Sequence, residues 1–251
     1  MTKIAVSGGL GRMGRRICRI VADSPEAELS AVIESPGFPE TPGSYLGAEV
    51  TTGTLPAGEA DVVIDFSHPL NTLDILDECV RSETKLVIGT TGFDEGQLDK
   101  IKSAASETAV LLSPNMSIGV NLLFRIAGII TESLPDFEKE IVEAHHNRKA
   151  DAPSGTALKI AEIISRAGDE VVNGRSGKPG PRKKGEIGVH AVRGGGITGE
   201  HTVMWIGEHE RIELFHRAET RGIFASGAVR AALWLKDRPS GKLYSMEDVL
   251  K

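Results

Sequence analysis

The sequence predicts an α/β protein, with an N-terminal doubly wound parallel sheet followed by a smaller C-terminal α+β domain that has a mixed, open sheet. Two observations predict this fold. Over the first 115 residues, short apolar, β-branched runs alternate with segments of helical period, as in parallel sheets covered by helices. After Asn115 the pattern changes to helices and several strand-like runs. We therefore expect one domain at 1–116, with 226–251 packing back onto it, and a second at 117–225.

The first domain is expected to alternate strands and helices. The strands are predicted at 3–8, 28–34, 61–67, 85–92 and 109–115, and the helices at 11–24, 69–81 and 94–106. Met13, Ile17 and Val21 recur at helical spacing in the first helix. The strand DVVIDFS is apolar without alternation, as expected for a strand covered on both faces, and Pro69 suits the first turn of the next helix. Residues 35–58 hold four prolines and are predicted to be one long connection.

The second domain is predicted to combine two helices with several strands. The helices are expected at 117–133 and from Ser154 onward, and the strands at 137–146, 186–193, 200–207 and 210–218, the last two joined by a tight turn near Glu208. The loop at 173–185 is rich in Gly, Lys and Arg and allows two interpretations, a mobile lid over an anionic substrate or an ordinary solvated loop. A further helix is expected from Gly222 to Asp237.

Composition narrows the class of protein. Charged residues make up 25% and hydrophobic residues 40% of the chain, which is typical of globular proteins. A net charge of −6 gives no general attraction to nucleic acid or anionic membranes, and only 4% of residues are aromatic, so stacking on bases is not expected. No apolar run approaches the roughly 20 residues of a membrane span, and no secretory signal is visible. We expect a cytoplasmic protein, with Cys18 and Cys79 as buried thiols.

A glycine-rich loop between the first strand and the first helix predicts dinucleotide binding. Gly9, Gly11 and Gly14 form the pattern G-x-G-x-x-G, which permits a tight turn, close approach of a pyrophosphate and close packing of helix on strand. Glu34 ends the second strand, where a carboxylate accepts the hydroxyl groups of the adenosine ribose. The combination predicts a Rossmann-like domain. Glu34 favours NADH, while Arg12 in the loop keeps NADPH open.

Two further loops follow later strands of the same sheet, GTTG at 89–92 and SPNM at 113–116. In doubly wound folds the carboxyl ends of the strands line the ligand crevice, so we expect these loops to meet the nicotinamide half of the cofactor. Taken alone, each loop is explained equally well as an ordinary turn.

Two adjacent histidines and a lysine are candidate proton donors. His145 and His146 end a predicted strand, where alternation sends their side chains to opposite faces, so they cannot share one role. Lys149 follows within one short loop. A histidine taken singly is more often structural than catalytic.

The residues that follow predict an anion site. Pro153 stiffens the chain and Ser154 suits an N-cap, so the N–H groups of Gly155 and Thr156 begin a helix at its positive end. A carboxylate bound there gains hydrogen bonds and the favourable field of the helix dipole. The stretch therefore predicts a site that binds an anionic substrate and moves protons beside it.

The later histidines allow a metal site as one interpretation. They are His190, His201, His209 and His216. No HExxH or Cys/His ligand spacing supports a metal, so we predict none and interpret these residues as core or solvated histidines.

The chain resembles the dihydrodipicolinate reductase family, also called 4-hydroxy-tetrahydrodipicolinate reductases. The stretch EAHHNRKADAPSGTA resembles the family signature, and equivalents exist for GRMG, DFSHP, GTTGF, SPNMSIGVNLL, RSGKPGPR and FASGAVRAALWL. The likeness covers nearly the whole length. It implies an NAD(P)H-dependent oxidoreductase of lysine and diaminopimelate biosynthesis that reduces a cyclic dicarboxylate to tetrahydrodipicolinate, and a homotetramer assembled through the second sheet. Ser35 departs from relatives that carry a basic residue, which puts NADPH preference in doubt.

The resemblance also implies roles for individual residues. His145 would be the proton donor or acceptor, and Lys149 the donor that completes the reduction. His146 would contact substrate, while Gly155 and Thr156 would bind one carboxylate. Cofactor contacts would fall on Gly8, Gly9, Leu10, Gly11, Arg12, Met13, Glu34, Gly89, Thr90, Thr91, Ser113, Pro114, Asn115 and Met116. Two alternatives stay open, another two-domain NAD(P)-dependent dehydrogenase and a nicotinamide-binding regulator without turnover.

Overall fold

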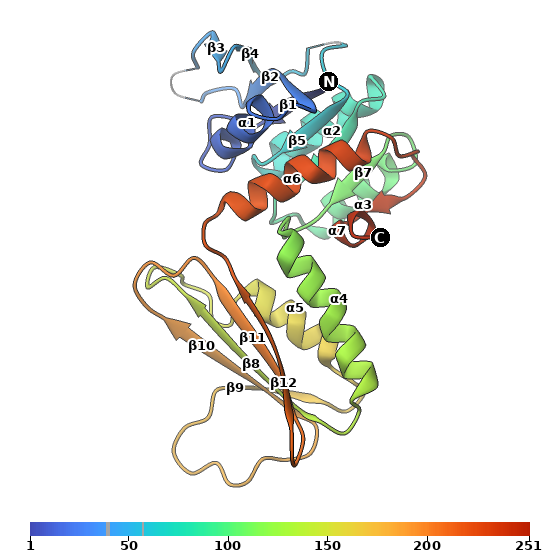
Figure 1. The fold of residues 1–251 in the computed structure, drawn as a ribbon. Helices are drawn as coiled ribbons and strands as arrows, with labels where there is room; N and C mark the ends of the chain where they lie inside the picture. Colours follow the sequence, from blue (N-terminus) through green and yellow to red (C-terminus); the bar gives the residue numbers. More distant parts are fainter. Residues whose placement is uncertain (39–40, 57) are drawn as a thin grey trace. The chain divides into compact units, whose positions relative to one another are not determined.

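The computed structural model describes residues 1–38, 41–56 and 58–251, which form two compact units. The first unit comprises Met1–Ile118 with Gly222–Lys251, and the second comprises Gly119–Arg221. Each unit has its own sheet (Figure 1). Each also has its own apolar core. Among the helices described, none is both long and apolar enough to cross a membrane.

The first unit is built on an eight-stranded, mainly parallel sheet. Its strands are β1 (Thr2–Ser7), β2 (Ala27–Glu34), β3 (Ser44–Tyr45), β4 (Ala48–Thr52), β5 (Val62–Asp65), β6 (Lys85–Ile88), β7 (Val110–Leu112) and β13 (Leu243–Tyr244). They lie in the order β13-β7-β6-β5-β1-β2-β4-β3, and β1 pairs in parallel with both β2 and β5. The strand order reverses at β1, which is the point where doubly wound sheets bind ligands. The predicted Rossmann-like sheet is confirmed.

Helices cover both faces of this sheet, as its unbroken apolar strands require. The helices are α1 (Gly14–Ala22), α2 (Pro69–Arg81), α3 (Glu95–Ala104), α6 (Gly222–Leu235) and α7 (Met246–Val249). One apolar cluster contains Ile17 of α1 and Ala228 of α6, and the cluster on the other face contains Leu76 of α2. Helix α6, which follows the second unit in the chain, therefore packs beside α1 in the first unit.

Both cysteines lie inside these helices. Cys18 and Cys79 have no solvent exposure, and burial raises the pKa of Cys18 to about 12 and also raises the pKa of Cys79. The prediction of two buried thiols is confirmed. Neither cysteine has the depressed pKa and exposure of a nucleophile.

The expected long connection at 35–58 contains two strands, so this prediction was wrong in part. Strands β3 and β4 lie within it and extend the sheet beyond β2. Strand β3 forms the edge of the sheet, β4 lies between it and β2, and the two strands have few buried residues, so backbone pairing rather than an apolar pattern defines them. Residues 39, 40 and 57 of this stretch lie outside the described residues. The short elements β13 and α7 were not predicted either.

The second unit is a five-stranded mixed sheet with helices on one face. Its elements are α4 (Ile118–Ser133), β8 (Glu138–His145), α5 (Gly155–Ile164), β9 (Glu170–Asn173), β10 (Glu186–Arg193), β11 (Glu200–Ile206) and β12 (Arg211–Arg217). In the order β12-β11-β8-β10-β9, β8 is parallel to β10 and antiparallel to β11. Alternate residues such as Ile141, Val203 and Trp205 pack against α4 and α5, while Val192 and Phe215 of the other face are exposed. The predicted mixed, open sheet is confirmed; β9 was not predicted.

Candidate active site

The glycine loop joins β1 to α1 at the point where the strand order reverses. Gly8 has a φ of 70°, and its carbonyl oxygen accepts a hydrogen bond from the Gly11 N–H at 3.0 Å, which closes a tight turn. A Cβ on Gly14 would overlap the Gly8 carbonyl oxygen, so α1 can begin against the loop only because Gly14 has no side chain. Arg12 is exposed, whereas Leu10 is buried. The loop thus has the compact backbone that dinucleotide binding requires.

Glu34 ends β2 beside the glycine loop. Its Oε1 accepts a hydrogen bond from the Leu10 N–H at 2.5 Å, and burial raises the pKa of this carboxyl. Glu34 lines a small cavity together with Ser35, Asn71 and Asp74. The second carboxylate at this cavity was not predicted, because only the packing of α2 on the sheet brings Asp74 close to the end of β2.

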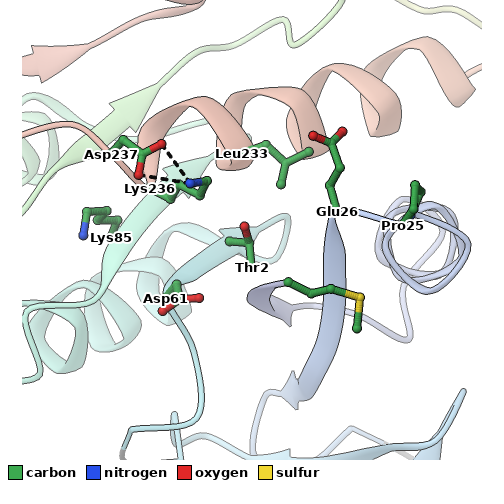
Figure 2. Close-up of a pocket in the computed structure, with 9 residues that line it drawn as sticks. Thr2, Pro25, Glu26, Asp61, Lys85, Leu233, Lys236 and Asp237 are labelled. Atoms are coloured by element: carbon green, nitrogen blue, oxygen red, sulfur yellow. Dashed lines mark hydrogen bonds and ion pairs between the residues drawn. The ribbon is translucent and has the colours of Figure 1, made fainter.

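A larger cavity of the same unit lies at the other end of the sheet (Figure 2). It has a volume of about 610 Å³, and it is lined by Thr2 at the start of β1, Asp61 just before β5 and Lys85 at the start of β6. Because doubly wound folds bind ligands at the carboxyl ends of their strands, we do not assign this cavity to the cofactor.

A buried aspartate fixes the loops that follow β5 and β6. Asp65 has no solvent exposure and accepts hydrogen bonds at 2.6 Å from the hydroxyls of Ser7, Ser67, Thr72 and Thr90. The Thr90 oxygen also accepts the Ser67 N–H at 2.9 Å. Thr90, a predicted cofactor contact, therefore uses its side chain to hold the loop in place.

The other predicted residues of the nicotinamide side occupy the ends of β6 and β7. Gly89 lies against an aromatic ring with no room for a side chain. The Ser113 hydroxyl donates to the carbonyl oxygen of Asn115 at 2.8 Å, which closes the turn that follows β7. Met116 is 2% exposed and belongs to the core, so its side chain is structural. The exposed residues of the two loops are Thr91, Gly92 and Pro114.

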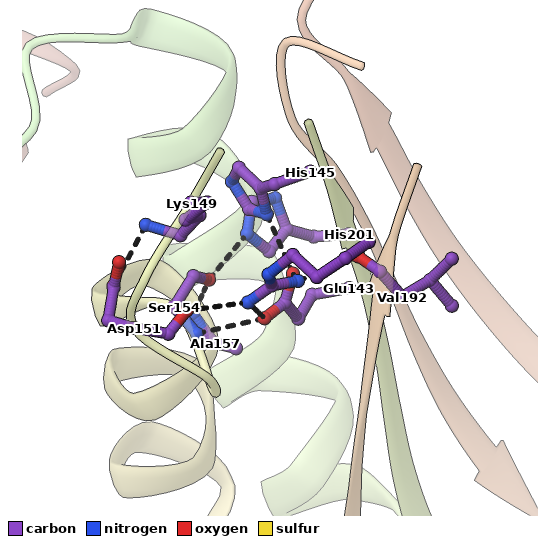
Figure 3. Close-up of polar contacts among 9 residues, drawn as sticks. Glu143, His145, Lys149, Asp151, Ser154, Ala157, Val192 and His201 are labelled. Carbon is purple, nitrogen blue, oxygen red and sulfur yellow. Dashed lines mark hydrogen bonds and ion pairs between the residues drawn. The ribbon is translucent and has the colours of Figure 1, made fainter. Parts of the chain in front are cut away.

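The second unit gathers polar groups at the His145 end of β8 (Figure 3). His145 Nδ1 lies 2.6 Å from Oε2 of Glu143, which is two residues earlier on the same face of the strand. Arg193, the register partner of His145 on β10, donates to both Glu143 oxygens at 2.7 Å, and the Ser154 N–H donates to Oε1 at 2.9 Å. Burial alone would raise the pKa of Glu143, but the hydrogen bonds from Arg193, His145 and Ser154 hold it below its ordinary value.

Helix α5 begins beside this cluster. The predicted N-cap is confirmed, because Ser154 Oγ accepts the Ala157 N–H at 3.2 Å. Ser154 Oγ also lies 3.2 Å from Nε2 of His201. Outside its own helix and chain neighbours, no described atom lies within 4 Å of a Cβ built on Gly155. The positive end of α5 is therefore accessible to a ligand at Gly155.

Lys149 and His146 lie in the loop between β8 and α5. Lys149 Nζ donates to Oδ2 of Asp151 at 2.8 Å, and the Lys149 side chain is 20% exposed. Burial, and then the positive charge of Arg148, lowers the pKa of His146. Figure 3 shows His145 and Lys149 in one cluster with the start of α5.

His201 is a buried neighbour of His145 whose position was not predicted. It is 4% exposed, and its ring centroid lies 5.3 Å from that of His145. Burial, and then the charge of His145, lowers the pKa of His201 to about 4. Elsewhere, His190 Nε2 lies 2.7 Å from Oε2 of Glu140, and His209 is exposed. Among the described residues, no group of three or more His, Cys, Asp and Glu side chains is arranged to hold a metal ion.

Replacing His201 with Gln is expected to flatten the acid dependence of stability. The folded state binds the His201 proton only near pH 4, whereas the ordinary value is 6.5, so this residue's contribution is complete above pH 6.5 and is lost as the pH falls towards 4. The full loss is up to about 3 kcal/mol. Urea denaturation between pH 6.5 and 5 measures this loss as a fall in the free energy of unfolding. The range stays above the pH at which most carboxylates take up protons. The exposed His209→Gln variant is the control, and equal pH slopes in the two variants would contradict the prediction.

The basic loop lies away from the His145 cluster of its own chain, so a lid over the substrate stays a prediction. Arg175 donates to Oε1 of Glu140 at 3.1 Å, and Arg182 also donates to Glu140. Glu140 precedes His145 by five residues on β8, which corresponds to about 17 Å along the strand. Figure 1 shows the loop between β9 and β10 at the end of the sheet opposite the start of α5.

Comparisons with known proteins agree over the whole chain. The family profile described as dihydrodipicolinate reductase, N-terminus, matches residues 2–116, and the C-terminus profile matches residues 119–250. The 4-hydroxy-tetrahydrodipicolinate reductases of Nitrosomonas europaea and Methanopyrus kandleri are 42% and 47% identical, over 98% and 100% of this chain and 97% of each relative. The solved structure of a dipicolinate-bound dihydrodipicolinate reductase from Paenisporosarcina sp. has a TM-score of 0.81 at 27% identity and covers 99% of both chains.

Proposed function

This chain belongs to the dihydrodipicolinate reductase family, and we propose that it reduces 4-hydroxy-tetrahydrodipicolinate to tetrahydrodipicolinate with NAD(P)H, in diaminopimelate and lysine biosynthesis. The observation that carries the proposal is the grouping of His145, Lys149 and the accessible start of α5 in the second unit. The first unit fits the cofactor, because its glycine loop has no room for a Cβ at Gly14 and a buried carboxylate, Glu34, ends β2.

The proposed roles of His145 and Lys149 follow from proton balance. When bound, the reduced nicotinamide supplies the hydride. Adding hydride to an unsaturated ring that contains an imine leaves an electron pair on ring carbon or nitrogen, and that atom must take up a proton. A protonated His145 imidazole and the Lys149 ammonium can each donate a proton, and both lie in the cluster beside the start of α5. Their positive charges also favour binding of a dicarboxylate substrate.

The start of α5 is the proposed site for one substrate carboxylate. The N–H groups of Gly155 and Thr156 lie at the positive end of this helix, where an anion gains hydrogen bonds and the field of the helix dipole. His146, in the loop just before, is the proposed further substrate contact.

NADH is expected to have a higher kcat/KM than NADPH. The proposed cofactor contacts are the loop 8–13, Glu34, 89–91 and 113–116. At the end of β2 the carboxylates of Glu34 and Asp74 line one cavity, and both would repel a 2′-phosphate. Steady-state kinetics with each cofactor measure the ratio of kcat/KM for NADH to kcat/KM for NADPH. Glu34→Gln should narrow the ratio, whereas Glu28→Gln, an exposed position on the same strand, should not; an NADPH preference of tenfold or more in the wild type would contradict the expectation.

The open face of the second sheet is the proposed surface for a homotetramer, as the family resemblance implies. Val192 and Phe215 expose 47% and 52% of their surface on this face, which offers apolar area that a second copy of the chain would cover. Light scattering on the purified chain measures the mass of the assembly.

The cytoplasm is the expected compartment for a reductase that uses NAD(P)H in lysine biosynthesis.

Loss of reduced-nicotinamide absorbance with enzymatically generated substrate tests the proposed reaction. We expect steady oxidation by the wild-type protein. Cofactor binding without any turnover would refute the reductase and favour a nicotinamide-binding regulator. A semialdehyde dehydrogenase is disfavoured already, because that chemistry needs an accessible cysteine and both thiols are buried.

A further inference from the structure

Glu143 receives contacts from donors on every side. Arg193 supplies two N–H groups at 2.7 Å, one to each carboxylate oxygen, and the Ser154 N–H supplies a third hydrogen bond at 2.9 Å. The remaining contact joins Oε2 to Nδ1 of His145 at 2.6 Å. With no solvent exposure, Glu143 depends on these groups for all the hydrogen bonding described for it.

These contacts decide which nitrogen of His145 carries the proton. Arg193 and a backbone N–H can only donate, so both oxygens of Glu143 accept; despite burial, these hydrogen bonds hold the pKa of the carboxyl below its ordinary value, so it is ionised near neutral pH. Nδ1 of His145 must then donate to it. In neutral His145 the Nε2 atom is consequently the proton acceptor, and in charged His145 it carries the proton that can be transferred.

We propose that Glu143 is a positioning residue that fixes the tautomer and orientation of His145, so that Nε2 is the atom that exchanges a proton with the substrate. The proposal rests on the proposed function, in which His145 acts on the substrate. Gly199 supports it from the Nε2 side, because a Cβ there would lie only 3.1 Å from Nε2. The missing side chain keeps space beside the reactive nitrogen.

Several titratable groups face His145, and Glu143 is the anion in direct contact with it. The groups are Glu143 on β8, Arg193 on β10, His201 on β11, and His146, Lys149 and Asp151 in the loop before α5. His201 is neutral near pH 7 and the loop cations disfavour a charged imidazole. Glu143→Gln therefore takes away the contacting anion that stabilises the positive charge on His145 during proton transfer.

The same strand carries a matched pair on its opposite face. Glu140 Oε2 lies 2.7 Å from Nε2 of His190, and Glu140 also receives hydrogen bonds from Arg175 and Arg182. Here the carboxylate contacts Nε2 rather than Nδ1, so the expected tautomer is the opposite one. Glu140 and His190 therefore serve as the control pair in the same protein.

Proton–nitrogen NMR of the wild-type protein, labelled at its seven histidines, tests the tautomer directly. Neutral His145 is expected to carry its proton on Nδ1, and neutral His190 on Nε2. The variants His145→Gln and His190→Gln assign the two signals. A neutral His145 protonated on Nε2 would overturn the proposal, whether or not any Glu143 variant folds.

Steady-state kinetics of the Glu143→Gln variant test whether the negative charge of Glu143 is needed for proton transfer by His145. We expect kcat to fall about 10- to 100-fold, a KM for substrate within about threefold of wild type, and an alkaline limb of the kcat/KM profile shifted to lower pH. Glu143→Asp should restore part of the rate, and Glu140→Gln should leave rate and profile unchanged. A lower kcat with an unshifted profile would show a merely structural role and overturn the proposal. Wild-type inactivity would instead refute the proposed reaction and leave the NMR result standing.

Discussion

Replacing His145 with Gln is expected to lower kcat by about a hundredfold or more, and Lys149→Ala is expected to have an effect of similar size. Gln can still accept or donate a hydrogen bond near Glu143, but it cannot carry a proton through the reaction. Ala at 149 removes the ammonium that pairs with Asp151 at 2.8 Å beside the start of α5. Oxidation of reduced nicotinamide at saturating substrate measures both effects.

Two variants outside the cluster serve as controls for these losses. His190→Gln removes a histidine that contacts Glu140 on the open face of the sheet. Lys159→Ala removes an exposed lysine of α5 that pairs with Glu162 at 2.7 Å. Both controls should keep wild-type rates. Wild-type rates in His145→Gln and Lys149→Ala themselves would contradict the catalytic roles.

Replacing Gly14 with Ala is expected to raise the Kd for the reduced cofactor by about 10- to 100-fold, since overpacking of this kind costs about 1–3 kcal/mol. The added Cβ would overlap the carbonyl oxygen of Gly8 and crowd the backbone of Gly9, neither of which can rotate away as a side chain can. The turn would have to open, and its amides would move away from the pyrophosphate position. Fluorescence titration with NADH measures the Kd.

Gly96→Ala is the matched control for this change. It also places a Cβ near the start of a helix in the first unit, but the closest described atom there is Asp94 Oδ1 at an ordinary 3.5 Å. Its cofactor Kd should equal that of the wild type. A folded Gly14→Ala variant with an unchanged Kd would show that the loop does not need a glycine at this position.

The parts of the fold that were predictable share one property, an apolar pattern that burial makes obligatory. The helix predicted at about 69–81 agrees with α2, because Pro69 after a buried strand marks its first turn. In contrast, β4 is a short strand with one buried residue, and β9 is a short, largely exposed edge strand. Pairing with neighbouring strands, which is a property of the folded sheet, defines them.

The candidate site was predictable only where its residues are close in sequence. His145, Lys149 and the cap Ser154 lie in one stretch with a recognisable order of residue types. Two neighbours of His145 come from other strands. Arg193 of β10 lies opposite His145 in the register with β8, and His201 of β11 packs its ring against that of His145. Glu143 carried a signal that was missed, since residues two apart in a strand share a face.

The most direct test of the central claim is a crystal structure of the wild-type protein with reduced cofactor and pyridine-2,6-dicarboxylate. The account predicts one ligand carboxylate within hydrogen-bond distance of the amides of Gly155 and Thr156, with His145 Nε2 and Lys149 Nζ directed at the ring. A carboxylate bound elsewhere, or a ring that neither base faces, would contradict it.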